Sequence, residues 1–329
     1  MSKLHVFTKR GSAHKSEQEI RPRLTSGLGL ERGIKKLEER RSQKESVREK
    51  GELKTQRARA WTEKLLLRVF SGVLYSVAVV SCIYADPTST AFAIAAMAWL
   101  CCSEFFHMIK LAHYNPYDFV GLFVALLFPI LALFNSYTLL LGTAILYALV
   151  LSVFYIASPH VTIADTALSF FAPMYTSLLF SHIVLLRCSQ PNFNAAVLTL
   201  VVMCSVWAND ISAYFVGCNF GKHPLAPTIS PHKSIEGFYG GLAASVAVWF
   251  GIYYFKLVPI SLGYALICGL VVGIVSVIGD LFESRIKRSV HLKDSGTIMP
   301  GHGGLLDRSD SMLFGCTAAY FLLVLGGLI

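Results

Sequence analysis

The chain has 329 residues, 54% of them hydrophobic, and its mean hydropathy is +0.56. This composition is too apolar for an ordinary water-soluble domain and indicates a protein with several membrane spans. The eight cysteines lie singly or as the pair Cys101-Cys102 within apolar runs. Neither a disulfide framework nor a zinc site is therefore expected.

The net charge of +9 is confined to residues 1–60, which contain 17 Lys or Arg and 8 Asp or Glu. This segment is predicted to be a basic, disordered cytoplasmic arm, with a helix over 31–59 where charges of both signs alternate. Neither a signal peptide nor a transit peptide fits its composition. It is either a solvated tail that obeys the positive-inside rule or a segment that binds anionic lipid or a partner.

Apolar runs of about the length of a membrane span follow one another from Leu65. We expect an all-α, polytopic integral membrane protein of about nine transmembrane helices with cytoplasmic catalytic loops. N-terminal transmembrane helices are assigned to 61–194 and a catalytic transmembrane region to 195–329. The spans are expected at 65–85, 90–111, 117–134, 136–157, 164–187, 195–217, 238–256, 260–282 and 311–329.

Two features of the loops follow from these spans. The charge-free run 119–157 is too long for one span, and Asn135-Ser136 in its middle predicts a tight hairpin. Counting spans from a cytoplasmic arm places the two long, charged loops, 218–237 and 283–310, on the cytoplasmic side as well.

Three polar clusters fall on this predicted face. Asp210 puts a carboxylate inside an apolar span, where it is costly unless it is paired, ligated or hydrated. The loop 217–237 combines glycines, hydroxyl groups and cations, a set that suits a polyphosphate. The third cluster, 279–310, holds ten ionisable side chains, His291 and His302 between two apolar runs.

The third cluster has the residue types of a magnesium site. If the helix from Ile260 continues through Arg288, then Asp280, Glu283, Ser284 and Lys287 share one face. Asp307 and Asp310 lie one turn apart at the expected start of the last helix. Carboxylates without cysteine suit Mg²⁺, and nearby cations would neutralise phosphate charge. Ordinary alternatives stay open, because acidic residues also favour helix N-termini and Lys287-Arg288 also suits a juxtamembrane anchor.

Taken together, these clusters resemble the phosphatidate cytidylyltransferase family, also called CDP-diacylglycerol synthase. The resemblance covers about 60–329 and is most specific in the last thirty residues. It departs from the family pattern at His232, where Lys or Arg is usual, and at Ser234, where Thr is common. The matching elements are Asn209-Asp210 with Ala213-Tyr214, Phe220-Gly221-Lys222, Ser230-Pro231-His232-Lys233-Ser234-Ile235-Glu236-Gly237, Ser284-Arg285-Ile286-Lys287-Arg288, Lys293-Asp294, Pro300-Gly301-His302-Gly303-Gly304 and Asp307-Arg308-Ser309-Asp310.

The resemblance implies transfer of CMP from CTP to phosphatidate, giving CDP-diacylglycerol and pyrophosphate. It implies Mg²⁺ held by Asp280, Asp307 and Asp310, with K⁺ as a candidate second cation, and a homodimer without a nucleic-acid partner. A bacterial-type plasma membrane is favoured, with the endoplasmic reticulum as the alternative. The implied catalytic residues are Asp280, Lys287, Arg288, Lys293, Asp294, His302, Asp307, Arg308 and Asp310. The implied substrate-binding residues are Asp210, Tyr214, Lys222, Ser230, Lys233, Ser234, Glu236 and Ser284.

Two other functions remain open from the sequence. A CTP-dependent polyprenol or dolichol kinase could carry similar Gly-Asp and Lys-Arg elements, although the complete His-Gly-Gly-x-x-Asp-Arg-x-Asp tail favours the cytidylyltransferase. An ion or solute transporter could use Asp210 and Asp280 as intramembrane carboxylates. A transporter predicts internal repeats and carboxylates at mid-span, whereas the sequence shows no repeat.

Overall fold

The computed structural model describes residues 35, 39, 41, 42, 72–189, 193–296, 298 and 303–329. The predicted N-terminal arm therefore lies almost wholly outside the described residues, apart from Lys35, Glu39, Arg41 and Ser42, which are helical. His302 of the predicted site also lies outside them. Met1–Glu63 and Lys64–Ile329 are separate compact units.

Helices dominate the described part of the second unit. They are Gly72–Ala85, α2 (Pro87–Leu111), α3 (Asp118–Leu131) with the 3-10 turn η1 (Ala132–Phe134), α4 (Tyr137–Ala157), α5 (Ile163–Pro173) continued by the π-helical turn η2 (Met174–Leu178) into α6 (Leu179–Cys188), α7 (Phe193–Phe220), α8 (Ile235–Tyr254), α9 (Leu262–Ser289), the 3-10 turn η3 (Leu306–Arg308) and α10 (Asp310–Leu325).

The all-α membrane class predicted from the sequence is confirmed. Among the described residues, six helices are long and apolar enough to cross a membrane, at Pro87–Leu111, Tyr137–Ala157, Ile163–Cys188, Asn194–Phe220, Ile235–Tyr254 and Leu262–Ser289. Three further apolar helices, Gly72–Ala85, Asp118–Phe134 and Asp310–Leu325, are shorter. Each predicted run overlaps one of these helices. The count of nine spans is not confirmed, because a span takes about 20 residues.

Local sequence signals explain where several helices begin and end. Asp86 caps α2, since its Oδ1 accepts a hydrogen bond from the Ser89 N–H at 2.8 Å, and Pro87 stands at the first helical position. After η1, Asn135 adopts a left-handed conformation with φ 47°, and Ser136 then precedes α4. The hairpin predicted at Asn135-Ser136 is confirmed.

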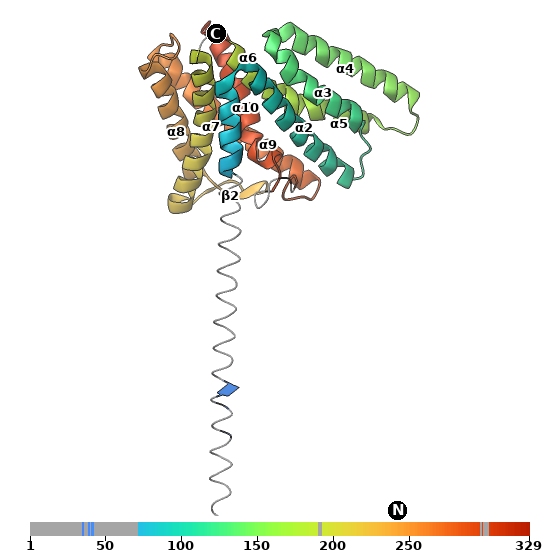
Figure 1. Cartoon of the computed structure of the whole chain (residues 1–329). Coiled ribbons are helices and arrows are strands. Elements are labelled where there is room, and N and C mark those ends of the chain that lie inside the picture. Colours follow the sequence, from blue (N-terminus) through green and yellow to red (C-terminus); the bar gives the residue numbers. More distant parts are fainter. Residues whose placement is uncertain are drawn as a thin grey trace, which may run out of the picture. The chain divides into compact units, whose positions relative to one another are not determined.

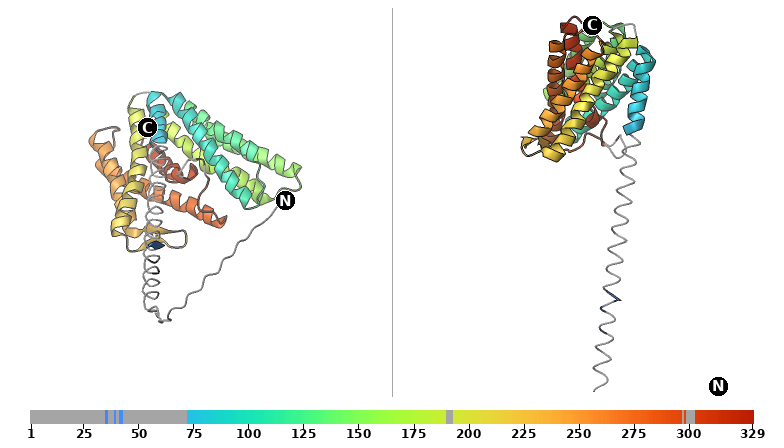
Figure 2. Two further views of the ribbon diagram at one scale, coloured as in Figure 1. Left: turned by 60° about the horizontal axis from the view of Figure 1, so that its bottom comes forward. Right: turned by 90° about the vertical axis from the view of Figure 1, so that its left-hand side faces the viewer.

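The helices form two groups around a shared core. α7 packs on α8, α8 on α9 and α9 on α10, while α2 to α6 pack among themselves and meet α10 through α6. Figure 1 shows α7 and α8 at one side and α3 to α5 at the other, and the left view of Figure 2 shows the same order. Large buried side chains, among them Phe105, Phe128, Phe180 and Trp249, fill the interior. The packing brings segments far apart in sequence to one end of the bundle.

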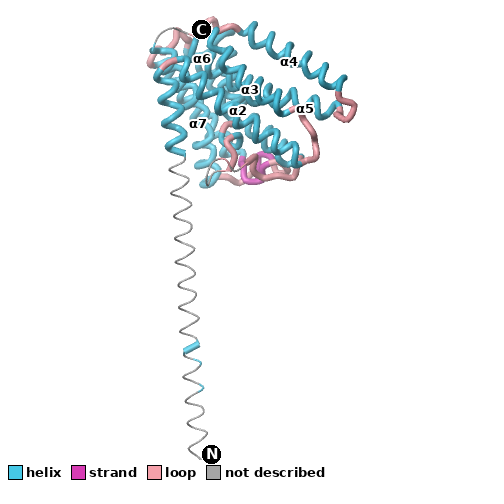
Figure 3. Tube along the Cα trace, turned by 45° about the vertical axis from the view of Figure 1, so that its right-hand side comes forward, coloured by secondary structure: helices cyan, strands magenta, loops and turns pink. Residues whose placement is uncertain are grey.

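A short antiparallel hairpin between α7 and α8 is an element that the sequence did not predict. Its strands are β1 (Pro224–Ala226) and β2 (Ser230–Ser234), within the segment expected to be a loop. Figure 3 shows the strands at the end of the bundle opposite the C-terminus. The predicted subdivision of the membrane part at 194 stays a prediction, and residues from both sides of it reach a pocket at this end of the bundle.

Candidate functional site

A pocket of about 1120 Å³ opens where the hairpin meets the helices. It is lined by the helix Gly72–Ala85, α7, β1, β2, the start of α8, α9, η3 and the first residue of α10. Its volume is slightly above the usual range for ligand pockets, about 300–1,000 Å³. Nine of the residues predicted for the site line it: Asp210, Tyr214, Ser230, Lys233, Ser234, Asp280, Asp307, Arg308 and Asp310.

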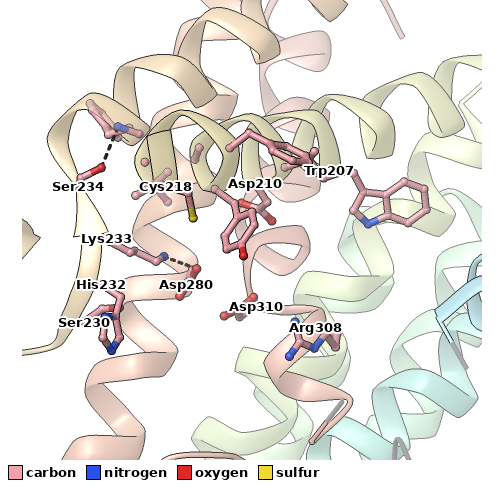
Figure 4. A pocket seen from close by; sticks show the side chains of 18 of the residues that line it. Trp207, Asp210, Cys218, Ser230, His232, Lys233, Ser234, Asp280, Arg308 and Asp310 are labelled. Atoms are coloured by element: carbon pink, nitrogen blue, oxygen red, sulfur yellow. Dashed lines mark hydrogen bonds and ion pairs between the residues drawn. The ribbon is translucent and has the colours of Figure 1, made fainter. Parts of the chain in front are cut away.

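Three carboxylates from three helices face this pocket. Figure 4 shows Asp210 of α7, Asp280 of α9 and Asp310 of α10 around one space. Asp280 forms an ion pair with Lys233 of β2, and its Oδ1 accepts a hydrogen bond from Ser284 Oγ at 3.3 Å. The close approach of like charges favours a cationic partner in the pocket.

The residue before Asp280 allows this close arrangement. A Cβ atom on Gly279 would lie 2.6 Å from the carbonyl oxygen of Asp310, far inside van der Waals contact. Glycine therefore lets the start of α10 reach α9 at the level of the carboxylates. In the pair Gly279-Asp280, the glycine is needed for close packing against α10, and the aspartate supplies the carboxylate.

Lys287 lies between two buried acids and outside the residues that line the pocket. Its ammonium group donates to Glu283 Oε2 at 2.7 Å and to Asp307 Oδ1 at 2.5 Å. Glu283 is fully buried and Lys287 is 7% exposed. The face that the sequence predicted for α9 is confirmed, because Asp280 contacts Ser284 and Glu283 contacts Lys287 along it. The charge of Lys287 is thus balanced within the protein.

Asp307 accepts four hydrogen bonds, one of them from the Lys287 ammonium group. Ser295 N–H donates to Oδ1 at 3.2 Å and to Oδ2 at 2.9 Å, and Gly304 N–H donates to Oδ2 at 2.9 Å. Burial raises the pKa of Asp307, but the Lys287 ammonium and the two backbone N–H groups outweigh it and keep that pKa below its ordinary value. The carboxylate of Asp307 is therefore held in place by these hydrogen bonds, and its ionised form is favoured.

Glu236 and Ser234 organise the hairpin side of the pocket. Glu236 Oε2 accepts hydrogen bonds from the N–H groups of Lys222 at 3.0 Å and His223 at 3.3 Å, and its Oε1 lies 2.6 Å from His223 Nδ1. Ser234 caps α8 by accepting from the Gly237 N–H at 3.1 Å. These contacts fix the chain on both sides of Lys233, the cation that reaches the carboxylates.

The remaining predicted residues that the structure describes do not line the pocket. Arg288 donates through Nη1 to the Leu292 carbonyl oxygen at 2.7 Å. Lys293 and Asp294 are not among the lining residues either. The residues that do not line the pocket are Lys222, Glu236, Ser284, Lys287, Arg288, Lys293 and Asp294. Their assigned catalytic and substrate-binding roles stay predictions, as does that of His302.

The donor chemistry of the pocket fits a hard divalent cation. Carboxylate and hydroxyl oxygens face it from several elements, and oxygen ligands are those that Mg²⁺ prefers. Among the described residues, no three His, Cys, Asp or Glu side chains are gathered closely enough to hold a metal ion as they stand. In this arrangement Lys233 and Lys287 supply the positive charge at Asp280 and Asp307.

Sequence reasoning overlooked one polar residue connected to the site. Glu104 of α2 is 4% exposed and accepts hydrogen bonds from the segment that precedes η3. A signal was present, since a lone carboxylate in an apolar run is costly and usually has a function. Its partners could not be read from the sequence, because they lie about 200 residues further along the chain.

Comparison with known proteins identifies the family. The model of the cytidylyltransferase family matches residues 66–325. The phosphatidate cytidylyltransferase of Bacillus subtilis (strain 168) is 40% identical over 156 residues, which are 47% of this chain and 56% of that protein. Those of Staphylococcus haemolyticus (strain JCSC1435) and Staphylococcus aureus (strain COL) are 46% and 47% identical over 109 residues, 33% of this chain and 42% of each relative. The chain thus spans about half the length of the curated relatives it matches.

Proposed function

This chain belongs to the cytidylyltransferase family, and from that premise we propose that it is a phosphatidate cytidylyltransferase. It transfers CMP from CTP to phosphatidate and releases CDP-diacylglycerol and pyrophosphate. The names of the bacterial relatives support this substrate pair. The pocket supports it independently, because it offers separate surfaces for a nucleotide and a lipid.

The observation that carries the proposal is the mixed lining of the pocket. Lys233 and Arg308 lie beside the carboxylates, while Ile211, Tyr214 and Phe215 line the same space and are 55%, 68% and 60% exposed. Phosphatidate stays in the bilayer and CTP stays in water, so their reaction needs a polar pocket that is continuous with an apolar surface. Lys233 and Arg308 provide the polar part, and Ile211, Tyr214 and Phe215 provide the apolar part.

The chemistry requires positioning and charge neutralisation. A phosphate oxygen of phosphatidate attacks the α-phosphorus of CTP, a new P–O bond forms, and the bond to the β-phosphate breaks to release pyrophosphate. The attacking oxygen is already anionic, so no strong base is needed. The main barrier is repulsion between two phosphorylated substrates, which Lys233 and Arg308 reduce. Ser230 and Ser234 donate hydrogen bonds to nucleotide phosphates.

Asp280, Asp307 and Asp310 would hold Mg²⁺, with K⁺ as a candidate second cation. A bound Mg²⁺ supplies charge neutralisation and polarisation at phosphate oxygens. In the structure, Lys233 pairs with Asp280 and Lys287 pairs with Asp307, so two of the carboxylates that would hold the cation already have a basic partner. Lys233, which lines the pocket, would then be available to anionic groups, while Lys287 would keep its ion pair with the buried Glu283.

The placement in the cell follows from the same reaction. The protein is an integral membrane protein, and we propose that the pocket faces the cytoplasm because CTP is found there. The bacterial relatives favour a plasma membrane of bacterial type. A homodimer is the proposed assembly.

The test follows the fate of two labels. Purified protein in detergent receives phosphatidate and Mg²⁺ with CTP labelled at either the α- or the γ-phosphorus. The proposal predicts that the α-label enters the lipid and the γ-label appears in pyrophosphate. A γ-label transferred to a polyprenol would instead establish a lipid kinase. Solute flux in proteoliposomes, with no label transferred, would point to a transporter.

A further inference from the structure

Glu104 is a carboxylate inside a helix of the apolar bundle. It belongs to α2, is 4% exposed, and has the fully buried Cys101, Cys102 and Phe105 as near neighbours in sequence. A carboxylate in such surroundings is destabilising unless hydrogen bonds replace its hydration. Its partners therefore indicate what it does.

Among the described residues, three donate hydrogen bonds to Glu104, and all three belong to the segment that leads to Asp307. Leu305 N–H donates to Oε1 at 3.0 Å, Leu306 N–H donates to Oε2 at 2.9 Å, and Ser295 Oγ donates to Oε2 at 3.2 Å. These donors are uncharged, and two of them belong to the main chain. Hydrogen bonds from neutral donors to a carboxylate are strong and directional, so Glu104 fixes the path of the backbone here.

Two glycines make the contact possible. A Cβ atom on Gly296 would lie 2.6 Å from Glu104 Oε1, and one on Gly304 would lie 2.7 Å from Oε2. The segment thus closes around the carboxylate more tightly than any larger residue would allow. This fit places Glu104 against both Gly296 and Gly304.

The same segment is tied to the pocket on its other side. The N–H groups of Ser295 and Gly304 donate to Asp307, while the Ser295 hydroxyl donates to Glu104. Ser295 therefore joins the two carboxylates, one in the bundle core and one at the pocket. Displacing the segment from Glu104 would move the donors that hold Asp307.

We propose that Glu104 is a positioning residue that sets the place of Asp307 and Asp310 relative to Asp280. The inference rests on the proposed function for its kinetic consequences, but not for its structural ones. Glu104 touches neither substrate. It acts through the hydrogen bonds that hold the segment carrying Asp307 and Asp310.

The test compares Glu104→Gln with a matched change on the same helix. Glutamine keeps the shape but presents an NH₂ donor to N–H donors, so at least one of the hydrogen bonds from Leu305 and Leu306 is lost. His107→Gln is the control, because His107 is an exposed residue of α2. In Glu104→Gln, amide hydrogen exchange at Ser295, Leu305 and Leu306 should accelerate at least tenfold, while the control matches wild type.

Kinetics then distinguishes positioning from simple loss of folded protein. The Mg²⁺ concentration for half-maximal CMP transfer should rise about 10- to 100-fold in Glu104→Gln, as for residues that orient metal ligands. A smaller amount of folded enzyme would lower the rate without changing this concentration. Glu104→Asp, which keeps the charge, should recover part of the loss.

A second variant covers the case in which Glu104→Gln does not fold. Ser295→Ala removes one donor to Glu104 and keeps the Ser295 N–H, so it should raise the half-maximal Mg²⁺ concentration by a smaller factor. Amide hydrogen exchange that is unchanged in Glu104→Gln would overturn the positioning role. So would faster exchange combined with an unchanged half-maximal Mg²⁺ concentration. If wild type transfers no CMP, the proposed function fails, while the exchange experiment still decides whether Glu104 holds the segment.

Discussion

Lys287→Met removes the cation that balances two buried acids. In the wild type the ammonium group contacts Glu283 at 2.7 Å and Asp307 at 2.5 Å, and Glu283 is fully buried. Methionine has a similar length but no charge, so both carboxylates remain without their counter-ion. Breaking a buried ion pair from one side costs about 3–5 kcal/mol, because the remaining charge stays desolvated. We expect a loss of that size in the free energy of unfolding.

The assay is SDS-induced unfolding in mixed micelles, followed by tryptophan fluorescence. Lys110→Met is the matched control, because Lys110 pairs with Asp118 at 2.5 Å but the two side chains are 44% and 39% exposed. An exposed pair contributes about 0–1 kcal/mol. A loss in Lys287→Met no larger than in the control would refute the reasoning.

A second substitution tests the cause of the loss. Glu283→Gln added to Lys287→Met removes the buried charge that has lost its partner, while Asp307 keeps the hydrogen bonds from Ser295 and Gly304. The double variant should recover at least half of the lost free energy. A double variant that is less stable than Lys287→Met would show that packing, not charge, is responsible.

Two further predictions concern Asp307 and Gly279. The pKa of Asp307 is lower in the folded protein than its ordinary value of 3.8, so its ionised form stabilises the fold above that pH and the stabilisation disappears only as the pH falls below it. The difference in unfolding free energy between wild type and Asp307→Asn should therefore be constant from pH 7 to about 5 and shrink at lower pH; a difference already shrinking at pH 6 would contradict this. Gly279→Ala places a Cβ 2.6 Å from the Asp310 carbonyl oxygen and should cost about 1–3 kcal/mol, measured by the same unfolding assay. Gly142→Ala, where no atom lies within 4 Å of the added Cβ, should be neutral or stabilising, and equal effects of the two changes would refute the steric argument.

The sequence predicted the parts of the fold that depend on local pattern. Apolar run length located the helices, and Asn135-Ser136 marked a hairpin because asparagine tolerates the left-handed backbone. Helical spacing also predicted the shared face of Asp280 and Lys287. The count of nine spans is not confirmed, because within the described residues three apolar helices are shorter than a membrane crossing.

Long-range contacts were beyond sequence reasoning. Nothing local to Glu104 shows that Leu305 and Leu306 donate to it, and nothing local to Lys287 shows that Asp307 balances it. Such contacts depend on the packing of α2, α9 and α10, which a single sequence does not specify. Residue type and spacing therefore predicted which groups carry the chemistry, while their pairing required the structure.

Asp280→Asn tests most directly the claim that this pocket transfers CMP to lipid. The substitution keeps the size of the side chain and removes the carboxylate that pairs with Lys233. With phosphatidate, Mg²⁺ and α-labelled CTP, the rate of lipid labelling should fall about a thousandfold or more, as when several kcal/mol of transition-state stabilisation is lost. Asp118→Asn, which changes an exposed carboxylate away from the pocket, should label lipid at the wild-type rate. Equal rates in Asp280→Asn and wild type would contradict the account.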